Sequence, residues 1–260
     1  MSKFKLIAGP CAVEERDTCY AIAGHLKRMA EKYELDLIFK ASYKKANRTK
    51  LNSFTSIGEG QALQILEDIR KEFSVHTITD IHESTDPERI AAHVDYFQIP
   101  AFLCRQTDLL INAGKYAPKG VNIKKGQFLS PEMMQFAAEK VRFGNPNTDV
   151  LLTERGTTFG YEYLITDMTS FPKMSAFGTT IMDCTHSVQI PNQSSGITGG
   201  DARMIGTMAK AAIAAGAQGL FIEVHPEPSK ASSDAGSILQ MDKLEEILRV
   251  CVRIYDAVRQ

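Results

Sequence analysis

Short apolar runs alternate with amphipathic stretches along the whole chain. Residues 35–39 form an apolar run typical of a buried strand, and residues 61–73 then place Leu63, Leu66 and Ile69 at helical spacing. The same alternation continues to residues 241–258, which again show helical spacing. The pattern predicts strands at residues 5–8, 35–39, 75–79, 94–99, 121–123, 150–153, 179–182 and 220–222. It predicts helices at residues 15–34, 61–73, from about 87, 109–113, 131–143, 169–177, 204–215 and 241–258.

Eight strand–helix units in a chain of 260 residues match the α/β (βα)8 TIM barrel in number and in size. No shift in composition divides the chain. We therefore expect one (βα)8 barrel, a catalytic domain that spans residues 1–260. In such a barrel the carboxyl ends of the strands meet at one rim, and that rim carries the active site.

Reactive or charged side chains stand at or just beyond the predicted end of each strand. The positions are Cys11, Lys40, Asp80, Gln98, Lys124, Arg155, His186 and Glu223. A barrel would bring all of them to the same rim.

Apolar content, net charge and the number of cysteines narrow the class of protein. The chain is 43% apolar with a net charge of −1, which disfavours a nucleic-acid partner because phosphate-backbone binding normally requires a wide basic surface. It has neither an apolar run of transmembrane length nor a signal-peptide pattern, so we expect a cytoplasmic protein with no membrane partner. The five cysteines are odd in number and scattered, which favours free thiols, catalysis or metal binding over a disulfide framework.

Positive charge is concentrated in the segment FKASYKKANRTK, residues 39–50. Because it begins where a strand ends, we read it as a site for phosphate or carboxylate groups. A solvated loop is the alternative. Further cations at Arg105, Lys124 and Arg155 exceed the need of one phosphate and indicate two anionic substrates, or one that carries both groups. Ordinary ion pairs with Glu154, Asp80 or Asp183 would also account for several of these cations.

A second group of residues could bind a metal. Cys11, His186, Glu223 and Asp234 offer one sulfur, one nitrogen and two oxygen donors. Such a mixed set suits zinc, iron or manganese, whereas magnesium and calcium favour oxygen ligands alone. Each residue is commonplace by itself, and His82 and His225 are competing histidines.

The motifs, taken together and in order, resemble those of the 3-deoxy-D-manno-octulosonate 8-phosphate synthases over nearly the whole chain. They read IAGPCAVE (7–14), FKASYKKANRT (39–49), TDIHES (79–84), QIPAFLCRQTDLL (98–110), NIKKGQF (122–128), TERGTTFGY (153–161), DCTHSVQ (183–189) and EVHPEPSKASSDA (223–235). The seven-carbon 3-deoxy-D-arabino-heptulosonate 7-phosphate synthases share a similar GPC start, but KANRT and QIPAFLCRQTDLL are similar to the eight-carbon branch.

The resemblance implies a role for each matched residue. Phosphoenolpyruvate would contact Lys40, Lys45, Gln98, Ala101, Lys124, Gln127 and Arg155. Arabinose 5-phosphate would contact Asn47, Arg48, Thr49, Asp80, Phe102, Arg105 and Gln189. The residues implied in catalysis are Lys45, Asp80, Lys124, His186 and Asp234. In the family, the arginine that matches Arg105 reaches the site of a neighbouring subunit, which implies a homotetramer.

The resemblance also implies dependence on a metal. Metal-dependent members carry Cys in the GPC motif and metal-independent members carry Asn, so Cys11 places this chain with the former. The implied ligands are Cys11, His186, Glu223 and Asp234. Two positions depart from the family pattern: Lys44 stands where many relatives have Asp, and Lys50 where a small polar residue is commoner.

The implied reaction condenses phosphoenolpyruvate with arabinose 5-phosphate and water, releases phosphate, and is a step in lipopolysaccharide biosynthesis. Two rival readings are a seven-carbon synthase that uses erythrose 4-phosphate and a non-catalytic phosphosugar-binding module. The metal could either orient the aldehyde or acidify water.

Overall fold

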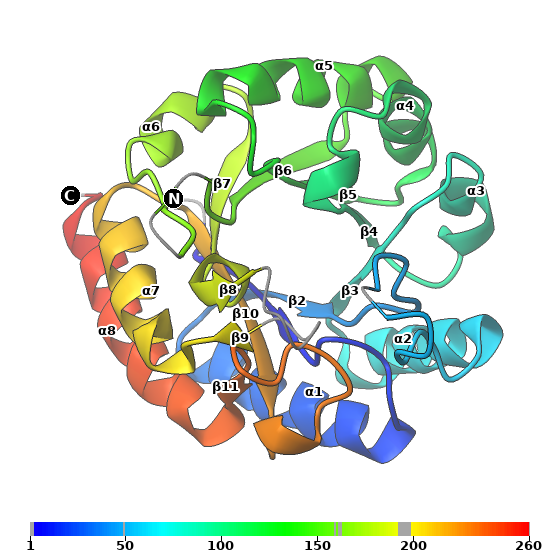
Figure 1. The fold of residues 1–260 in the computed structure, drawn as a ribbon, viewed down its shortest axis with the longest axis horizontal. Helices are drawn as coiled ribbons and strands as arrows, with labels where there is room; N and C mark the ends of the chain where they lie inside the picture. The colour runs from blue at the N-terminus through cyan, green and yellow to red at the C-terminus, as the bar shows by residue number, and fades with distance from the viewer. Residues whose placement is uncertain (1–2, 49, 159, 161–162, 192–198, 260) are drawn as a thin grey trace.

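A closed barrel of eight parallel strands forms the centre of the molecule (Figure 1). The computed structural model describes residues 3–48, 50–158, 160, 163–191 and 199–259. The barrel strands are β1 (Lys5–Gly9), β2 (Asp36–Lys40), β3 (His76–Asp80), β4 (Tyr96–Ile99), β5 (Gly120–Lys124), β6 (Asp149–Glu154), β7 (Thr179–Asp183) and β10 (Gly219–His225). Each strand pairs with the next, and β10 pairs with β1 to close the ring. The predicted (βα)8 barrel is confirmed.

The helices form a ring around the strands (Figure 1). They are α1 (Arg16–Lys32), α2 (Glu59–Phe73), α3 (Asp86–Ile90), α4 (Thr107–Tyr116), α5 (Met134–Gly144), α6 (Ser170–Met174), α7 (Ile205–Ala214) and α8 (Leu244–Ala257). Helix α8 shows why the periodicity predicted them: Leu244, Leu248, Cys251 and Tyr255 repeat at helical spacing and are all buried. No described helix combines the length and apolar character of a membrane span.

The structure adds detail that the pattern did not predict. Helix α6 is only five residues long, against the nine residues predicted at 169–177, because the chain must turn back into β7 at Thr179. Short 3-10 helices include η1 (Ala101–Leu103) and η3 (His186–Val188). Three short strands, β8 (Gln189–Ile190), β9 (Gly199–Gly200) and β11 (Leu239–Gln240), supplement the barrel. They lie in stretches for which we predicted no strand.

Apolar side chains fill the interior of the barrel below the rim. This layer consists of Ile7, Ile38, Ile78, Tyr96, Leu151, Ile181 and Phe221. Burying each Ile or Leu side chain contributes about 1.5–3 kcal/mol to folding. A larger apolar layer lies between the strands and the helices. The two layers fix the strands as a rigid frame for the rim.

The two-residue period of a strand places the polar rim directly above the apolar layer. Side chains two residues apart point to the same face, so Lys40 follows Ile38, Asp80 follows Ile78 and Glu223 follows Phe221 into the interior. Gln98 and Asp183 follow Tyr96 and Ile181 in the same way. The fold therefore directs these polar side chains toward one another.

Candidate active site

Polar residues at the carboxyl ends of six barrel strands are almost completely buried. They are Lys40 on β2, Asp80 on β3, Gln98 on β4, Lys124 on β5, Asp183 on β7 and Glu223 on β10, with exposures from 0% to 7%. Charged groups in the interior require partners. The ion pairs and hydrogen bonds among these buried side chains therefore determine the charge and geometry of the site.

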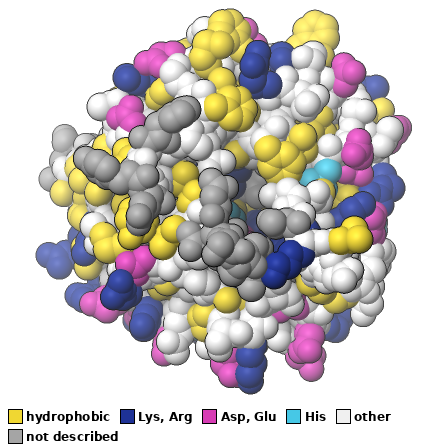
Figure 2. Space-filling view, viewed as in Figure 1, with side chains coloured by type: hydrophobic (Ala, Val, Ile, Leu, Met, Phe, Trp, Pro, Cys, Tyr) yellow, Lys and Arg dark blue, Asp and Glu magenta, His cyan; other side chains and the backbone are white. Residues whose placement is uncertain are grey.

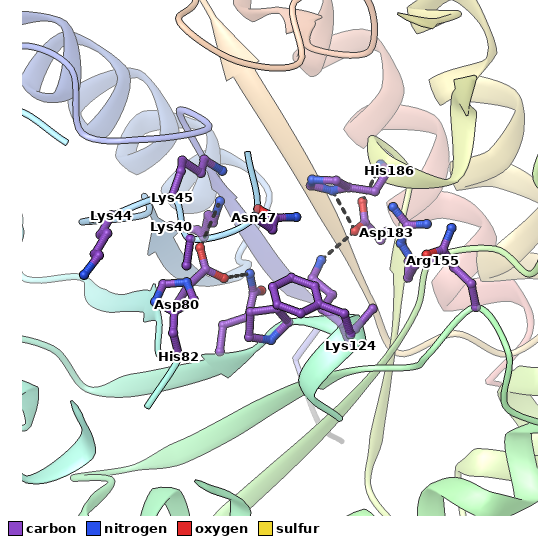
Figure 3. Close-up of a pocket in the computed structure, with 16 residues that line it drawn as sticks. Lys40, Lys44, Lys45, Asn47, Asp80, His82, Lys124, Arg155, Asp183 and His186 are labelled. Atoms are coloured by element: carbon purple, nitrogen blue, oxygen red, sulfur yellow. Dashed lines mark hydrogen bonds and ion pairs between the residues drawn. The ribbon is translucent and has the colours of Figure 1, made fainter. Parts of the chain in front are cut away.

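All of these side chains except Glu223 line the floor of a cavity of about 150 Å³, which we call the central lobe. Figure 3 shows Lys40, Lys45, Asp80, Lys124 and His186 converging on it. Among its described lining residues, five carry positive charge and two carry negative charge. The lining consists of Lys40, Lys44, Lys45, Ala46, Asn47, Asp80, His82, Gln98, Pro100, Ala101, Phe102, Lys124, Gln127, Arg155, Asp183 and His186. This excess of positive charge suits a multiply charged anion.

Lys40 is held between two carboxylates. Its Nζ donates to Glu223 Oε1 at 2.8 Å and to the carbonyl of Cys11 at 2.9 Å, and it lies 4.0 Å from Asp80 Oδ2. Burial alone would lower the pKa of Lys40, but the nearby negative charges, above all Glu223 and then Asp80, together outweigh burial and raise that pKa. Lys40 therefore stays positively charged, and its charge offsets those of the Asp80 and Glu223 carboxylates.

Lys124 differs because its environment disfavours its charge. Its Nζ donates to Asp183 Oδ2 at 2.6 Å and lies 3.1 Å from the centre of the Phe221 ring. Burial nevertheless lowers the pKa of Lys124 to about 8. The same Asp183 oxygen is 2.9 Å from His186 Nδ1, and the interactions with His186 and Lys124 hold the pKa of Asp183 below its usual range despite burial. Lys124 can therefore gain or lose a proton near neutral pH.

A second cavity of about 530 Å³, the outer lobe, adjoins the central lobe and shares Lys45, Asn47, Arg155 and His186 with it. Its described lining adds Arg48, Lys50, Ser53, Phe54, Gln189, Ala231, Ser232, Ser233, Asp234 and Ala235. Arg48 donates to Ser233 Oγ at 2.6 Å and to the carbonyl of Ser232 at 3.3 Å. Arg48 therefore connects the loop after β2 with the loop after β10.

Two cations between the lobes have unused donors. One guanidinium nitrogen of Arg155 donates to Gln189 at 2.9 Å, but Nη1 is buried without a hydrogen-bond partner among the described residues. Lys45, which is half-buried, makes no ion pair through Nζ within the described part of the chain. A buried donor without a partner is costly. A bound anion at this point would satisfy the buried Arg155 nitrogen and could also contact Lys45.

Three of the four predicted metal ligands form one cluster. Donor atoms of Cys11, Glu223 and Asp234 all lie within 4.8 Å of one another, and Cys11 Sγ is 3.4 Å from Asp234 Oδ2. His186 stands beside the cluster, with Nε2 3.9 Å from Glu223 Oε1. Burial raises the pKa of the Cys11 thiol, so a cation must displace its proton to bind.

The donor set fits a divalent transition metal. Glu223 Oε2 is buried and has no hydrogen-bond partner among the residues that the structure describes, which leaves it available to a cation. Asp183 lies against the other ring nitrogen of His186, the arrangement that commonly orients a metal-binding imidazole. The thiolate favours a zinc-like or iron-like ion over magnesium.

The structure gathers nearly all of the predicted site residues. Lys40, Lys45, Asn47, Asp80, Gln98, Ala101, Phe102, Lys124, Gln127, Arg155 and His186 line the central lobe. Arg48, Gln189 and Asp234 line the outer lobe, and Cys11 and Glu223 belong to the cluster beside it. Thr49 lies outside the described residues. Arg105 lines neither lobe; it borders a separate depression with His82, Ser84 and Asp108.

Two further observations concern residues that the sequence left open. The sequence indicates Asp183 only as an ordinary salt-bridge partner, yet Asp183 pairs with both Lys124 and His186. The signal in the sequence is its place at the end of a predicted strand. Lys44, the departure from the family pattern, donates to Glu59 at 2.8 Å and points away from the other labelled residues (Figure 3). Glu59 therefore neutralises much of the added charge.

The model of the DAHP synthetase I family matches residues 2–260. A 2-dehydro-3-deoxyphosphooctonate aldolase from Brucella canis is 47% identical over 245 residues, which span 94% of this chain and 87% of that protein. Proteins of the same name from Chelativorans sp. and Brucella anthropi are 48% and 47% identical, each across 94% of this chain and 88% of its own length.

Proposed function

This chain belongs to the DAHP synthetase I family, and we propose from that premise that it condenses phosphoenolpyruvate with D-arabinose 5-phosphate and water. The products are 3-deoxy-D-manno-octulosonate 8-phosphate and phosphate, and the reaction is a cytoplasmic step in lipopolysaccharide biosynthesis. The relatives' shared name refers to the same eight-carbon skeleton. The observation that carries the proposal is the junction of the two lobes, where Lys45 and Arg155 line both cavities and Arg155 Nη1 is buried without a partner among the described residues.

Phosphoenolpyruvate occupies the central lobe. Its phosphate and carboxylate are held by Lys45, Lys124 and Arg155, with Gln98, Gln127 and the backbone at Ala101 completing the contacts. Lys40 neutralises the carboxylates of the floor and so keeps the lobe attractive to an anion. This small cavity fixes the orientation of the enol carbon, C3.

The aldose phosphate occupies the outer lobe. Arg48, Asn47 and Thr49 anchor its phosphate, while Asp80, Phe102 and Gln189 line the path of the sugar toward the central lobe. Holding two mutually repelling anions together in this way lowers the activation barrier by several kcal/mol. Ideal proximity and orientation of two reactants can contribute ~7–11 kcal/mol.

The chemical step joins C3 of phosphoenolpyruvate to the aldehyde carbon. Water adds at C2, and phosphate leaves by cleavage of its C–O bond. His186 and the pair of Lys124 with Asp183 stand where protons must be held during these steps. A divalent transition metal (zinc, iron or manganese) bound by Cys11, His186, Glu223 and Asp234 supplies polarisation of a carbonyl oxygen or acidification of water.

We also propose that the enzyme is a homotetramer in which Arg105 enters a neighbouring site. The Arg105 side chain is exposed, and its guanidinium makes no hydrogen bond or ion pair within the described residues. Large exposed hydrophobic side chains lie in the same region, among them Phe102, Phe128, Met133 and Phe136. Figure 2 shows hydrophobic side chains gathered over the α4–α5 side of this face. Both features support an interface there.

The test is turnover by the purified enzyme. Phosphate release should require both phosphoenolpyruvate and arabinose 5-phosphate, should fall on addition of a chelator and should return with added metal. Release with erythrose 4-phosphate at an equal or higher rate would favour the seven-carbon reaction. Binding of both substrates without turnover, in metal-loaded enzyme, would favour a binding module.

A further inference from the structure

A line of buried side-chain hydrogen bonds runs across four consecutive barrel strands and ends at Asp80. Thr153 Oγ1 on β6 donates to Asn122 Oδ1 on β5 at 2.5 Å. Asn122 Nδ2 donates to Gln98 Oε1 on β4 at 2.9 Å, and Gln98 Nε2 donates to Asp80 Oδ1 on β3 at 2.5 Å. Ser42 Oγ donates to the other oxygen of Asp80. We call the series from Thr153 to Asp80 the relay.

Strand register places the members of the relay side by side. Asp80 pairs with Gln98, and Gln98 pairs with Asn122, so these three side chains occupy one level of the barrel. Thr153 pairs with Lys124 and therefore lies one level nearer the rim on the next strand. Neighbouring parallel strands are about 4.8 Å apart, a spacing that amide side chains can bridge.

The charge of Asp80 fixes the direction of every bond in the relay. An ionised carboxylate only accepts, so Gln98 must present its amide nitrogen and turn its oxygen toward β5. That oxygen requires the nitrogen of Asn122, which leaves Asn122 Oδ1 for a donor, and the hydroxyl of Thr153 supplies it. Without that hydroxyl, Asn122 Oδ1 loses its donor, and the amide orientation that serves Gln98 becomes less stable.

We propose that Asn122 and Thr153 are positioning residues that orient Gln98 and Asp80 in the active site. Both are 0% exposed and neither lines a lobe, whereas Gln98 and Asp80 line the central lobe. The inference rests on the proposed function, because Gln98 and Asp80 are there assigned to phosphoenolpyruvate and to the sugar. The Thr153 hydroxyl stabilises the amide orientations of Asn122 and Gln98 that the charge of Asp80 requires.

The kinetic test compares Thr153→Val with Thr153→Ser. Valine keeps the shape and removes the donor, so kcat should fall about tenfold, as for loss of one buried hydrogen bond. The KM of each substrate should change less than about twofold, because the cations that bind the anions are untouched. Serine keeps the hydroxyl and should restore most of kcat. Thr180→Val is the matched control: Thr180 is equally buried on β7, and its hydroxyl has no hydrogen-bond partner among the described residues, so kcat should stay unchanged.

A second measurement needs no substrate and so separates this inference from the proposed function. In enzyme labelled with ¹⁵N at glutamine, the Gln98 side-chain amide should shift and exchange its protons about tenfold faster in Thr153→Val but not in Thr153→Ser. If Thr153→Val does not fold, Asn122→Asp serves instead, because it places an acceptor opposite Gln98 Oε1 and so removes the donor that this oxygen uses. An unchanged Gln98 signal in whichever variant folds, or equal losses of kcat in the valine and serine variants, would overturn the inference. If the wild type lacks turnover but the Gln98 amide of Thr153→Val still differs from that of the wild type as predicted, the proposed function alone is overturned.

Discussion

At the scale of single residues, Lys124 is a cation whose charge depends on pH within the working range. Burial lowers its pKa to about 8, so the ammonium is present below that pH and is lost as the pH rises through it. We expect kcat/KM for phosphoenolpyruvate to fall about tenfold between pH 7 and pH 9, since only about a tenth of Lys124 remains charged at pH 9. The measurement is the pH profile of kcat/KM at saturating aldose phosphate. Lys124→Arg keeps its charge and should lack this fall; a wild-type profile that is flat to pH 10 would contradict the assignment.

Arg48 should matter for one substrate and not for the other. It lines only the outer lobe, so Arg48→Ala should weaken binding of the aldose phosphate by about 1.5–3 kcal/mol, the range for a charged hydrogen bond. Binding of phosphoenolpyruvate should change little. Calorimetric titration with each substrate separates the two. Lys71→Ala removes an exposed charge on α2, outside both lobes, and serves as the control. Equal losses for both substrates in Arg48→Ala would disprove the division into lobes.

Cys11 should determine whether activity depends on metal. Cys11→Ala removes the softest ligand of the cluster and should lose both the metal and most of the activity. Cys11→Asn should bind metal weakly yet keep measurable turnover in chelator, because its amide can hydrogen-bond where the thiolate stood. Elemental analysis beside turnover with chelator tests both variants. Full activity of wild type after its metal is stripped would refute the prediction.

At the scale of elements, the end of β1 must pass unusually close to the end of β2. A Cβ added at Gly9 would lie 2.0 Å from the carbonyl oxygen of Lys40, which no side chain tolerates. Gly9→Ala should therefore destabilise the fold by about 1–3 kcal/mol and displace Lys40 and Cys11. Gly60→Ala is the control, because α2 leaves open space there and the change should be neutral or stabilising by up to about 1 kcal/mol. The free energy of unfolding of both variants is measured by urea denaturation. Equal stability of Gly9→Ala and wild type would show that the two strand ends can separate without cost.

At the scale of the whole molecule, the proposed sharing of active sites predicts complementation. Arg105→Ala and Lys124→Ala should each be nearly inactive, the first for want of a neighbour's arginine and the second for want of its own lysine. After unfolding and refolding as a mixture, hybrid assemblies contain sites with an intact Lys124 that receive Arg105 from another subunit, so part of the activity should return. Each variant refolded alone is the control. No recovery in the mixture, with hybrids demonstrated by mass spectrometry, would refute shared sites.

The sequence by itself determined the barrel and the identity of most rim residues. Both follow from local rules: a two-residue period within strands, a helical period between them, and the meeting of parallel strand ends at one rim. Lys40, Asp80, Lys124 and Glu223 could therefore be assigned to the rim without coordinates. The motifs then supplied the expected substrates.

The tertiary structure alone decided which of these residues pair. Lys124 and Asp183 are 59 residues apart in the chain, and the Cys11–Asp234 contact spans 223 residues. No local pattern encodes which donor meets which acceptor at such separations, because strand register, side-chain direction and burial determine it together. For the same reason the sequence did not predict the ion pair of Lys44 with Glu59. Nor did it predict that hydrogen bonds connect Thr153 and Asn122, through Gln98, to Asp80. The pKa of Lys124 likewise depends on burial and on the charges that packing brings near it, which only the folded barrel sets.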